Sequence, residues 1–508
     1  MKKQLLIVCV ILICCQSIAD TYVGGMITED TTWVYSNSPY VASQSVLVMN
    51  GATLSIGPGV EVRFDPDTAL SITEGTLKAI GTDKNNIVFT ANISPKNVES
   101  NRWGGVGFEN MAADAMFDDN GNWTNGCILK YVVIEYAGGE VLQGAIDARD
   151  CSVLIDSSVV QSNSVTGIYL CDHNGTIIRN CLIQDNYDHA GGGIWLTGSY
   201  DIKIVGNSIL RNISNTDGGG IWITRTSPPQ TYNISVISNN ISYNSALSGA
   251  GISVASCSNL FLTYNTISYN SASFRGGGLF VHLDPSDMVS IHNDISYNSG
   301  PRGSGICCSG GSRMILSADP DNPTRIYGND GSAQVYSSAF FTGPNVYDNG
   351  NVDARNVYWG ATNESEVQSM IFDFMDDSSR GIVFYDPWLS HFDFWRTQYG
   401  LTTNDTEVMD RDSDNTSNWE EFIAGTDPTN SLSVFAINNI FAEDNQVVIE
   451  WNSSSDRLYT LWGCSNLVEN NWYSIRDDLV STEPINVITN IVSNALVYYK
   501  ISVNKVYF

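Results

Sequence analysis

Residues 251–270 read GISVASCSNLFLTYNTISYN, and residues 278–298 follow the same plan as GLFVHLDPSDMVSIHNDISYN. Two short patterns of this kind recur six times between Cys151 and Cys308: Ser/Cys/Asn-x-Ile-x-x-Asn, with Val in the first copy, and Gly-Ile/Leu-x-apolar. The asparagines are Asn163, Asn186, Asn212, Asn244, Asn270 and Asn298, and the glycines are Gly167, Gly193, Gly220, Gly251, Gly278 and Gly305. Successive asparagines are separated by 23, 26, 32, 26 and 28 residues, which is the period of a solenoid.

Within each repeat, apolar and polar residues alternate over three to five positions, which is typical of short strands and too short for amphipathic helices. One repeat is therefore predicted to be one coil. Coils stacked at about 4.8 Å would bury a column made of Ile183, Ile209, Ile241, Ile267 and Ile295. The asparagine amides would bond to one another at a corner, and the glycines suit a tight bend.

These repeats resemble the right-handed parallel β-helix of the pectin-lyase-like superfamily. The flanking segments are similar to those of secreted bacterial members, with a Gly57-Pro58-Gly59 corner and a closing segment at 356–360, NVYWG. The resemblance implies an all-β solenoid. Because the superfamily holds lyases, hydrolases, adhesins and inert scaffolds, the resemblance implies the shape more strongly than the reaction.

The first nineteen residues resemble an export signal. Lys2 and Lys3 precede an apolar run from Leu5 to Cys15, and Ser17-Ile18-Ala19 is a small-x-small cleavage site. The mature chain is expected to begin at Asp20 and to be secreted or held at the cell surface. No later apolar run reaches the roughly 18 residues of a membrane span.

The sequence predicts three further parts. Residues 20–389 form the β-helix, with irregular first coils at 20–126, regular repeats at 127–330, and closing coils with a capping helix at 331–389. The helix is expected from the spacing of Val367, Met370, Ile371, Phe374 and Met375. Residues 390–433 form a linker with a calcium-type loop, and residues 434–508 a small antiparallel β-sandwich.

Composition limits the partners. The chain has 25 basic and 54 acidic residues, which argues against nucleic acid and anionic lipid, since both are bound through Lys and Arg. Eight cysteines remain after residue 19 and form no CxxC pair, so disulfides are permitted but not required. A monomer is expected.

The acidic segment Asp410–Glu421 has the spacing of an EF-hand-like calcium loop. Positions 1, 3, 5, 7, 9 and 12 are occupied by Asp410, Asp412, Asp414, Thr416, Asn418 and Glu421. A hard cation needs several oxygens at one centre, and Thr416 is expected to offer its carbonyl. Position 6 is Asn415 instead of Gly; Asn tolerates a left-handed turn, so weakened binding is expected.

With residues 419–428, this segment resembles the thrombospondin type 3 and dockerin loops that precede terminal modules of secreted bacterial proteins. The alternative is an acidic linker without metal.

A second column is predicted to face outward, two positions after each glycine. It consists of Tyr169, Trp195, Trp222, Ser253, Phe280 and Cys307. Four of the six are aromatic, so Tyr169, Trp195, Trp222 and Phe280 could form a platform for sugar rings. The alternative is a stripe covered by a long turn, such as Thr224 to Tyr232.

A third column lies three residues before the glycines and contains Ala190, Asp217, Ser248, Arg275 and Arg302, with Asp188 and His189 just upstream. Clustered arginines could neutralise a uronate and acidify its α-proton, while Asp188, His189 or Asp217 could serve as base or calcium ligand. The alternative is that turn residues are polar because turns are solvated. Asn215-Thr216-Asp217 matches the first element of the polygalacturonase pattern, but the later elements are missing, so the two-carboxylate machinery of glycoside hydrolysis is unsupported.

The sequence thus favours a secreted carbohydrate-associated β-helix that binds a polysaccharide or cell-surface glycan, with calcium ordering the joint to the terminal module. One alternative is a polysaccharide lyase or glycoside hydrolase of the same fold. Another is a structural or adhesive surface solenoid.

Overall fold

The computed structural model describes residues 20–92, 102–109, 111–139, 141–172, 174–224, 231–282, 287–309, 313–316, 320–331, 333–338, 351–377, 380–443, 446–468, 470–491 and 498–505. The expected signal peptide at 1–19 lies outside these residues. The chain divides into two compact units. The first unit comprises the chain up to Leu316 together with Ile326–Asp353 and Met370–Val383. The second unit comprises Ser317–Arg325, Ala354–Ser369 and Phe384–Phe508.

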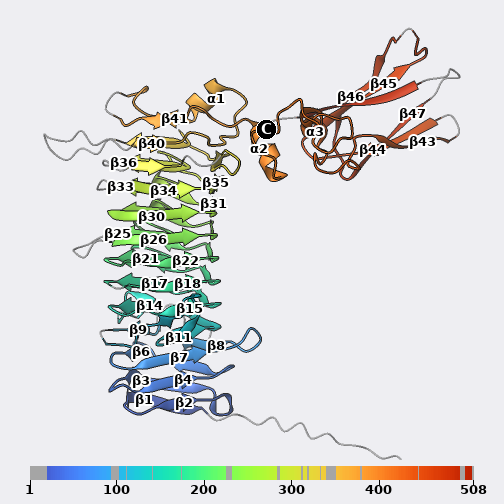
Figure 1. Ribbon diagram of the computed structural model, residues 1–508. Helices are drawn as coiled ribbons and strands as arrows, with labels where there is room; N and C mark the ends of the chain where they lie inside the picture. The colour runs from blue at the N-terminus through green and yellow to red at the C-terminus, as the bar shows by residue number, and fades with distance from the viewer. Residues whose placement is uncertain are drawn as a thin grey trace, which may run out of the picture. The chain divides into compact units, whose positions relative to one another are not determined.

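The first unit is a parallel β-helix whose coils each give strands to stacked parallel ladders (Figure 1). Ladder A carries the glycine pattern, ladder B leads into the asparagine corner, and ladder C closes the coil. One short side ladder of four strands and one two-stranded hairpin lie beside these coils. The predicted all-β solenoid is therefore confirmed.

Ladder A contains β1 (Thr21–Ile27), β3 (Tyr40–Val48), β6 (Ala69–Ile72), β9 (Gly105–Phe108), β14 (Gly144–Arg149), β17 (Thr166–Cys171), β21 (Ile194–Thr197), β25 (Ile221–Thr224), β29 (Ile252–Ala255), β33 (Leu279–His282), β36 (Ile306–Ser309), β39 (Val335–Ser338) and β41 (Ile371–Phe372). Ladder B contains β5 (Glu61–Phe64), β8 (Ile87–Ala91), β13 (Val132–Glu135), β16 (Val159–Gln161), β19 (Leu182–Gln184), β23 (Ser208–Leu210), β27 (Asn240–Ser242), β31 (Thr266–Ser268), β35 (Asp294–Ser296) and β38 (Arg325–Tyr327).

Ladder C contains β2 (Thr31–Trp33), β4 (Thr53–Ile56), β7 (Thr76–Ile80), β12 (Ile128–Lys130), β15 (Leu154–Asp156), β18 (Ile177–Arg179), β22 (Lys203–Val205), β26 (Thr231–Ile237), β30 (Cys257–Thr263), β34 (Asp287–Ile291), β37 (Arg313–Ile315) and β40 (Asn351–Asp353). The side ladder contains β20 (Tyr187–Asp188), β24 (Ile213–Ser214), β28 (Ser245–Ser248) and β32 (Ser271–Arg275), and β10 (Met116–Phe117) pairs with β11 (Trp123–Asn125).

The predicted isoleucine column lies in the core of ladder B. Ile183 pairs with Ile209, Ile209 with Ile241, Ile241 with Ile267 and Ile267 with Ile295. All five side chains are fully buried. Each such burial stabilises the coil by about 1.5–3 kcal/mol.

The predicted asparagine ladder is also present. The Asn244 amide donates from Nδ2 to Asn270 Oδ1 at 3.0 Å and to the Ile209 carbonyl at 2.9 Å, while its Oδ1 accepts from Asn212 Nδ2 at 3.1 Å. A second, unforeseen ladder of Asn207, Asn239, Asn265 and Asn293 repeats these bonds between ladders C and B. Each buried amide is satisfied only by the coils next to it, so the ladders fix the register of the stack.

The glycine column does not lie at the tight bend that the sequence predicted, and another constraint explains why glycine occupies it. A Cβ at Gly220 would lie 2.5 Å from the Gly251 carbonyl oxygen and 3.1 Å from Asn244 Nδ2. The neighbouring coil therefore excludes a side chain there. The bend itself falls two residues earlier, at Gly218, whose φ of +65° favours glycine.

The expected capping helix is shorter than its apolar spacing implied. Helix α1 spans Glu364–Ser369 and contains only Val367 of the predicted apolar face. Ile371 instead begins β41 and pairs with Val335 in ladder A. By pairing with β39, β41 satisfies backbone groups at the end of ladder A: the Gln334 and Val335 amides donate to the Met370 carbonyl at 2.8 and 3.1 Å.

The second unit holds α2 (His391–Gln398), α3 (Asn418–Ala424) and two antiparallel three-stranded sheets. One sheet contains β43 (Ile437–Glu443), β44 (Gln446–Asn452) and β47 (Ile485–Ile491), and the other contains β46 (Tyr473–Val480), β45 (Arg457–Cys464) and β48 (Tyr498–Lys505). Ile449, Trp451, Tyr459 and Leu461 form the buried centre between them. The predicted antiparallel C-terminal module is thus present, with β43 and β47 in addition to the expected strands.

In the part of the chain that the structure describes, none of the eight cysteines forms a disulfide. Among the described residues, no helix combines the length and the apolar character needed to cross a lipid bilayer.

Candidate functional site

The outward column runs along ladder A in the register that the sequence predicts. Tyr169 pairs with Trp195, Trp195 with Trp222 and Trp222 with Ser253. Phe280 and Cys307 continue the same row. All six side chains therefore point away from the core of the solenoid.

Exposure of this column was predicted wrongly for most of its members. Tyr169 is 8% exposed and Phe280 4%, while Ser253 and Cys307 are fully buried and Trp195 and Trp222 are half-buried. The two indoles stack at 4.8 Å with planes 19° apart, and Tyr169 meets the Trp195 ring edge-on at 4.8 Å. The facing sides of the two indoles are therefore used by one another, and Tyr169 and Phe280 are too buried to offer a free ring face to a sugar. Residues 225–230 of the turn proposed to cover it lie outside the described residues.

The arginine cluster, which we define as Asp217, Ser248, Phe274, Arg275 and Arg302, lies beside this column on successive coils. Asp217 pairs with Ser248, Ser248 with Arg275, and the Gly276 amide bonds to the Arg302 carbonyl at 2.9 Å. The predicted stacking of these residues is confirmed. The Phe274 ring lies between the guanidinium groups, 4.4 Å from Arg275 Cζ and 4.8 Å from Arg302 Cζ.

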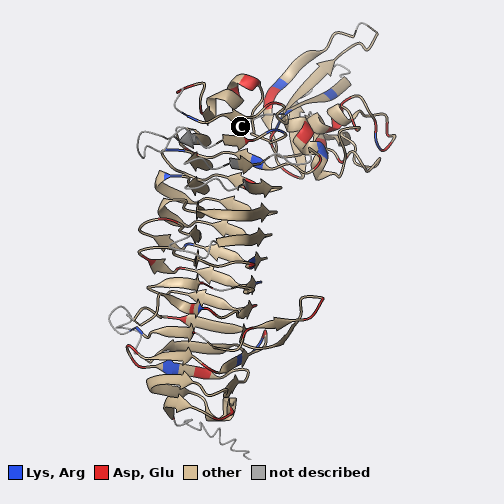
Figure 2. Cartoon of the chain, turned by 60° about the vertical axis from the view of Figure 1, so that its left-hand side comes forward, with Lys and Arg blue, Asp and Glu red and all other residues tan. Residues whose placement is uncertain are grey.

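The two arginines form no ion pair with any described residue, and Arg275 Nε is buried without a hydrogen-bond partner. Charged residues are otherwise sparse along the stacked coils (Figure 2). Arg302 is exposed and Arg275 half-buried. The cluster is therefore a fixed positive site with unused donors.

Two titratable groups lie near Arg275. Burial raises the pKa of Asp217, against the opposing effects of a Ser248 hydrogen bond and the Arg275 charge. Burial, aided by the Arg275 charge, lowers the pKa of His282 to about 4. The His282 ring stacks on Phe280 at 4.5 Å, and its Nε2 is buried without a partner. The pKa of about 4 makes His282 a neutral imidazole at pH 7.

This arrangement predicts an acid sensitivity specific to His282. The pKa of a histidine in the unfolded chain is near 6.5, above the value of about 4 in the folded protein. The neutral His282 side chain therefore makes its full contribution to folding stability above about pH 6.5. This contribution is lost as the pH falls through about 4, because the unfolded state takes up the proton first. Melting temperature measured from pH 7 to 4 should fall less steeply for His282→Gln than for the wild type. Asp217, whose pKa shifts in the opposite direction, is common to both proteins. Parallel curves would show that the imidazole is not held neutral.

Asp188 and His189 form hydrogen bonds with neighbouring coils at the turns of the side ladder. Asp188 Oδ2 accepts from the Thr166 amide at 3.0 Å and the Thr166 hydroxyl at 2.7 Å. The exposed His189 offers its carbonyl to the Thr216 hydroxyl at 2.9 Å. Both residues therefore have structural roles that the solvated-turn alternative anticipated.

An exposed tyrosine column was missed. Tyr243, Tyr269 and Tyr297 stack at 5.0 and 5.2 Å and are 58%, 48% and 48% exposed. The triplicated Ile-Ser-Tyr-Asn at 241–244, 267–270 and 295–298 was the available signal. Because the rings face one another, they present edges and hydroxyls to solvent.

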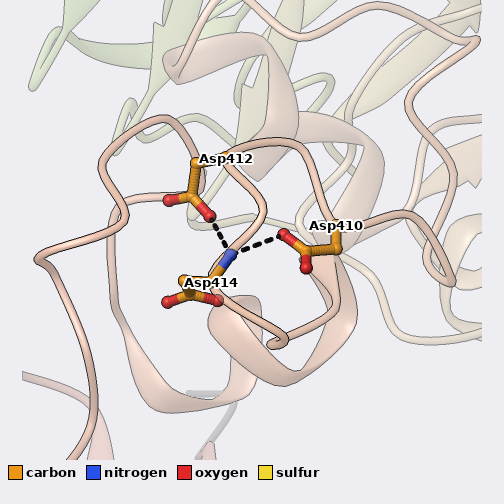
Figure 3. A group of neighbouring side chains, drawn as sticks. All are labelled: Asp410, Asp412 and Asp414. Carbon is orange, nitrogen blue, oxygen red and sulfur yellow. Dashed lines mark hydrogen bonds between the residues drawn. The ribbon is translucent and has the colours of Figure 1, made fainter.

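The acidic loop gathers three of its predicted ligands. Carboxylate oxygens of Asp410, Asp412 and Asp414 lie within 4.8 Å of one another (Figure 3). The Asp414 amide donates to Asp410 at 3.2 Å and to Asp412 at 3.3 Å. Asn415 has a φ of +72°, the left-handed turn expected at position 6.

Two further predicted ligands belong to α3, which follows the loop. Asn418 and Glu421 are fully buried at the start of α3, and Asn418 Oδ1 and Glu421 Oε2 have no hydrogen-bond partner. Burial, with the charges of Asp412 and Asp414, raises the pKa of Glu421 to about 7. Buried oxygens without donors beside repelling carboxylates fit a divalent cation of the calcium type.

The stacked ladders define an all-β right-handed parallel β-helix. Residues 115–295 match the protein-family model described as "Right handed beta helix region". Protein bark beetle of Drosophila melanogaster is 39% identical over 74 residues, which are 15% of this chain and 2% of that protein.

Three solved structures are similar in fold. The mannuronan C-5 epimerase AlgE4 A-module of Azotobacter vinelandii has a TM-score of 0.33 at 13% identity, covering 73% of this chain and 89% of its own. A periplasmic alginate epimerase, the AlgG T265N mutant, has a TM-score of 0.31 at 11% identity, covering 69% and 77%. Tailspike protein 4 of bacteriophage CBA120 has a TM-score of 0.31 at 11% identity, covering 95% and 66%.

Proposed function

We propose that this protein is an exported, carbohydrate-associated β-helix that binds an acidic polysaccharide at the arginine cluster. The observation that carries the proposal is the pair Arg275 and Arg302, which stand one coil apart and form no salt bridge with a described residue, although Asp217 of the same cluster interacts electrostatically with Arg275. In a chain with 54 acidic and 25 basic residues, unpaired arginines at fixed spacing mark a place for an anion from outside.

The chemistry of the cluster fits a uronate. A guanidinium group presents planar donors that match a carboxylate, and such charge-assisted bonds are stronger than neutral ones. Phe274 is 37% exposed between the two guanidinium groups and offers apolar surface to the C–H edge of a sugar. Stacked coils repeat at about 4.8 Å, so an extended chain lying along the ladder would meet Arg275 and Arg302 on two successive coils.

Replacing both arginines by alanine should therefore weaken binding of polyuronates by at least about tenfold, the effect of losing one charge-assisted bond. Affinity for a neutral glycan such as dextran should not change. Arg211→Ala is the matched control, because this exposed arginine already pairs with Asp185 at 2.8 Å. Affinity electrophoresis and calorimetry would measure the effect, and equal polyuronate affinity in all three proteins would refute the site.

A second candidate, a polysaccharide lyase or hydrolase, is favoured by Asp217 and His282 beside Arg275. In that case the arginine would neutralise the uronate, and the neutral imidazole would be the base for proton abstraction. Incubation with polyuronates should then give unsaturated-uronate absorbance or new reducing ends, lost in Asp217→Asn or His282→Gln. Binding without product would leave the glycan-binding function, and neither binding nor product would favour a structural or adhesive solenoid.

We further propose that the acidic loop holds calcium, with Asp410, Asp412, Asp414, Asn418 and Glu421 as side-chain ligands and Thr416 through its carbonyl. The ion would offset the repulsion among four carboxylates and fix the start of α3.

The C-terminal half of α3 is in contact with strands β45 and β48 of the terminal module. Arg457 of β45 donates from Nη2 to the Phe422 carbonyl at 2.8 Å and also bonds from Nε to the Ile423 carbonyl. Lys505 Nζ of β48 lies 4.9 Å from the Phe422 ring. A metal that orders α3 would therefore also order the sheet docked on it.

A further inference from the structure

We propose that the solvent face of the sheet β46-β45-β48 is a second binding surface, which takes an anionic sugar between Trp462, Trp472 and Lys500. It does not depend on the arginine cluster of the β-helix, since every residue it uses belongs to the C-terminal module.

Strand pairing places Trp462 and Lys500 on one face of the sheet, and the contact of the Lys500 ammonium with the Trp472 ring places Trp472 beside them. Trp462 of β45 lies opposite Lys500 of β48 and Ser474 of β46. Tyr459 and Leu461, the neighbours of alternate parity on β45, point the other way into the buried centre. Trp462 and Trp472 are half-buried, whereas the indole that builds the core is Trp451, at 1% exposure. The surface indoles are thus not needed to fill the sandwich.

The two indoles are held in place by their own hydrogen bonds. Trp462 Nε1 donates to the Ser502 hydroxyl at 2.8 Å, and Trp472 Nε1 donates to Asn470 Oδ1 at 2.9 Å. The Lys500 ammonium lies 5.3 Å from the Trp462 ring and 4.7 Å from the Trp472 ring. Both aromatic rings therefore position one cation before any ligand arrives, which lowers the entropy cost of binding.

The charge of Lys500 indicates which kind of ligand this surface would bind. Residues 434–508 contain eight acids and four bases, Arg457, Arg476, Lys500 and Lys505. Arg457 and Lys505 are engaged with α3. Among the described residues, no carboxylate forms an ion pair with Lys500. An ammonium that has no ion pair within the described part of the module, beside two hydrogen-bonded indoles and on a face with the Ser474 and Ser502 hydroxyls, matches a sugar that carries a carboxylate or sulfate.

The test uses the full-length protein and polyuronate oligosaccharides, with dextran oligosaccharides as the neutral probe. To isolate the second surface, the variants are made in the Arg275→Ala, Arg302→Ala background. Lys500→Gln should weaken the remaining polyuronate affinity by about tenfold, Lys500→Arg should retain it, and Lys84→Gln, an exposed lysine of the first coils, should have no effect.

Tryptophan fluorescence gives a second readout. Polyuronate should quench the emission of the double-arginine background, and Trp472→Phe should remove most of that quenching while the melting temperature stays within the range of the controls. The proposal is overturned if Lys500→Gln binds as tightly as Lys84→Gln, or if the background protein binds no polyuronate at all. If only the proposal for the arginine cluster were wrong, the double variant Arg275→Ala, Arg302→Ala would bind polyuronate as tightly as the wild type.

Discussion

Ile241→Asp is expected to unfold the regular coils around it. Ile241 is fully buried between Ile209 and Ile267 of ladder B. The substitution loses about 1.5–3 kcal/mol of apolar burial. It also places a carboxylate where the described neighbours offer no cation, at a further cost of several kcal/mol. The total is comparable with the roughly 5–15 kcal/mol stability of a whole domain.

The damage should be local, because the coils of a solenoid are stabilised mainly by their neighbours. Limited proteolysis should cut between about residues 209 and 267, and circular dichroism should show a partial loss of strand signal. Leu247→Asp is the matched control, since Leu247 is 44% exposed in the adjoining side ladder. If Ile241→Asp melted like Leu247→Asp, the isoleucine column would not be the core.

Asp412→Ala should abolish calcium-dependent protection of the segment 401–430. In the wild type, the proposed ion would relieve the repulsion among Asp410, Asp412, Asp414 and Glu421. At a calcium concentration 100 times the dissociation constant, binding would add about 2.7 kcal/mol to stability. The dissociation constant is expected near 10⁻⁴–10⁻³ M, as in extracellular modules, which is weaker than the roughly 10⁻⁷–10⁻⁵ M of calcium sensors.

Proteolysis with calcium and with chelator, followed by calorimetry, measures this effect. Calcium should slow cleavage in the wild type and in Glu407→Gln, a control that changes an exposed acid just before the loop. It should have no influence on Asp412→Ala. The β-helix fragments should be the same in all samples. Identical cleavage of the wild type with calcium and with chelator would exclude the metal site.

The repeat period was readable because the same local chemistry recurs in every coil. In each repeat the isoleucine adds to a buried column, the asparagine to an amide ladder, and the glycine to a row where backbones of neighbouring coils approach closely. The pattern of the acidic loop could be recognised for a related reason, because its six predicted ligands lie within twelve consecutive residues, Asp410 to Glu421. In both cases the interacting groups are set by a local pattern.

Other features were misread although their residues were noticed. The spacing of Val367 to Met375 favoured a helix, but pairing of Ile371 with Val335 ended it at Ser369. The direction of the Trp195 and Trp222 side chains followed from strand alternation. Their loss of free ring faces did not, because it depends on stacking between coils at 4.8 Å.

The sequence by itself therefore determined the solenoid, its core column, its asparagine corner and the spacing of the polar residues in the acidic loop, since each depends on periodicity or on neighbouring residues. Only the tertiary structure decided which buried polar atoms lack a partner among the described residues: Arg275 Nε near Asp217 and His282, and Asn418 Oδ1 and Glu421 Oε2 in α3. It also decided that Lys500 lies beside two indole rings. The physical reason is that burial and pairing are set by coil register, strand register and the packing of segments distant in the chain, which no local pattern specifies.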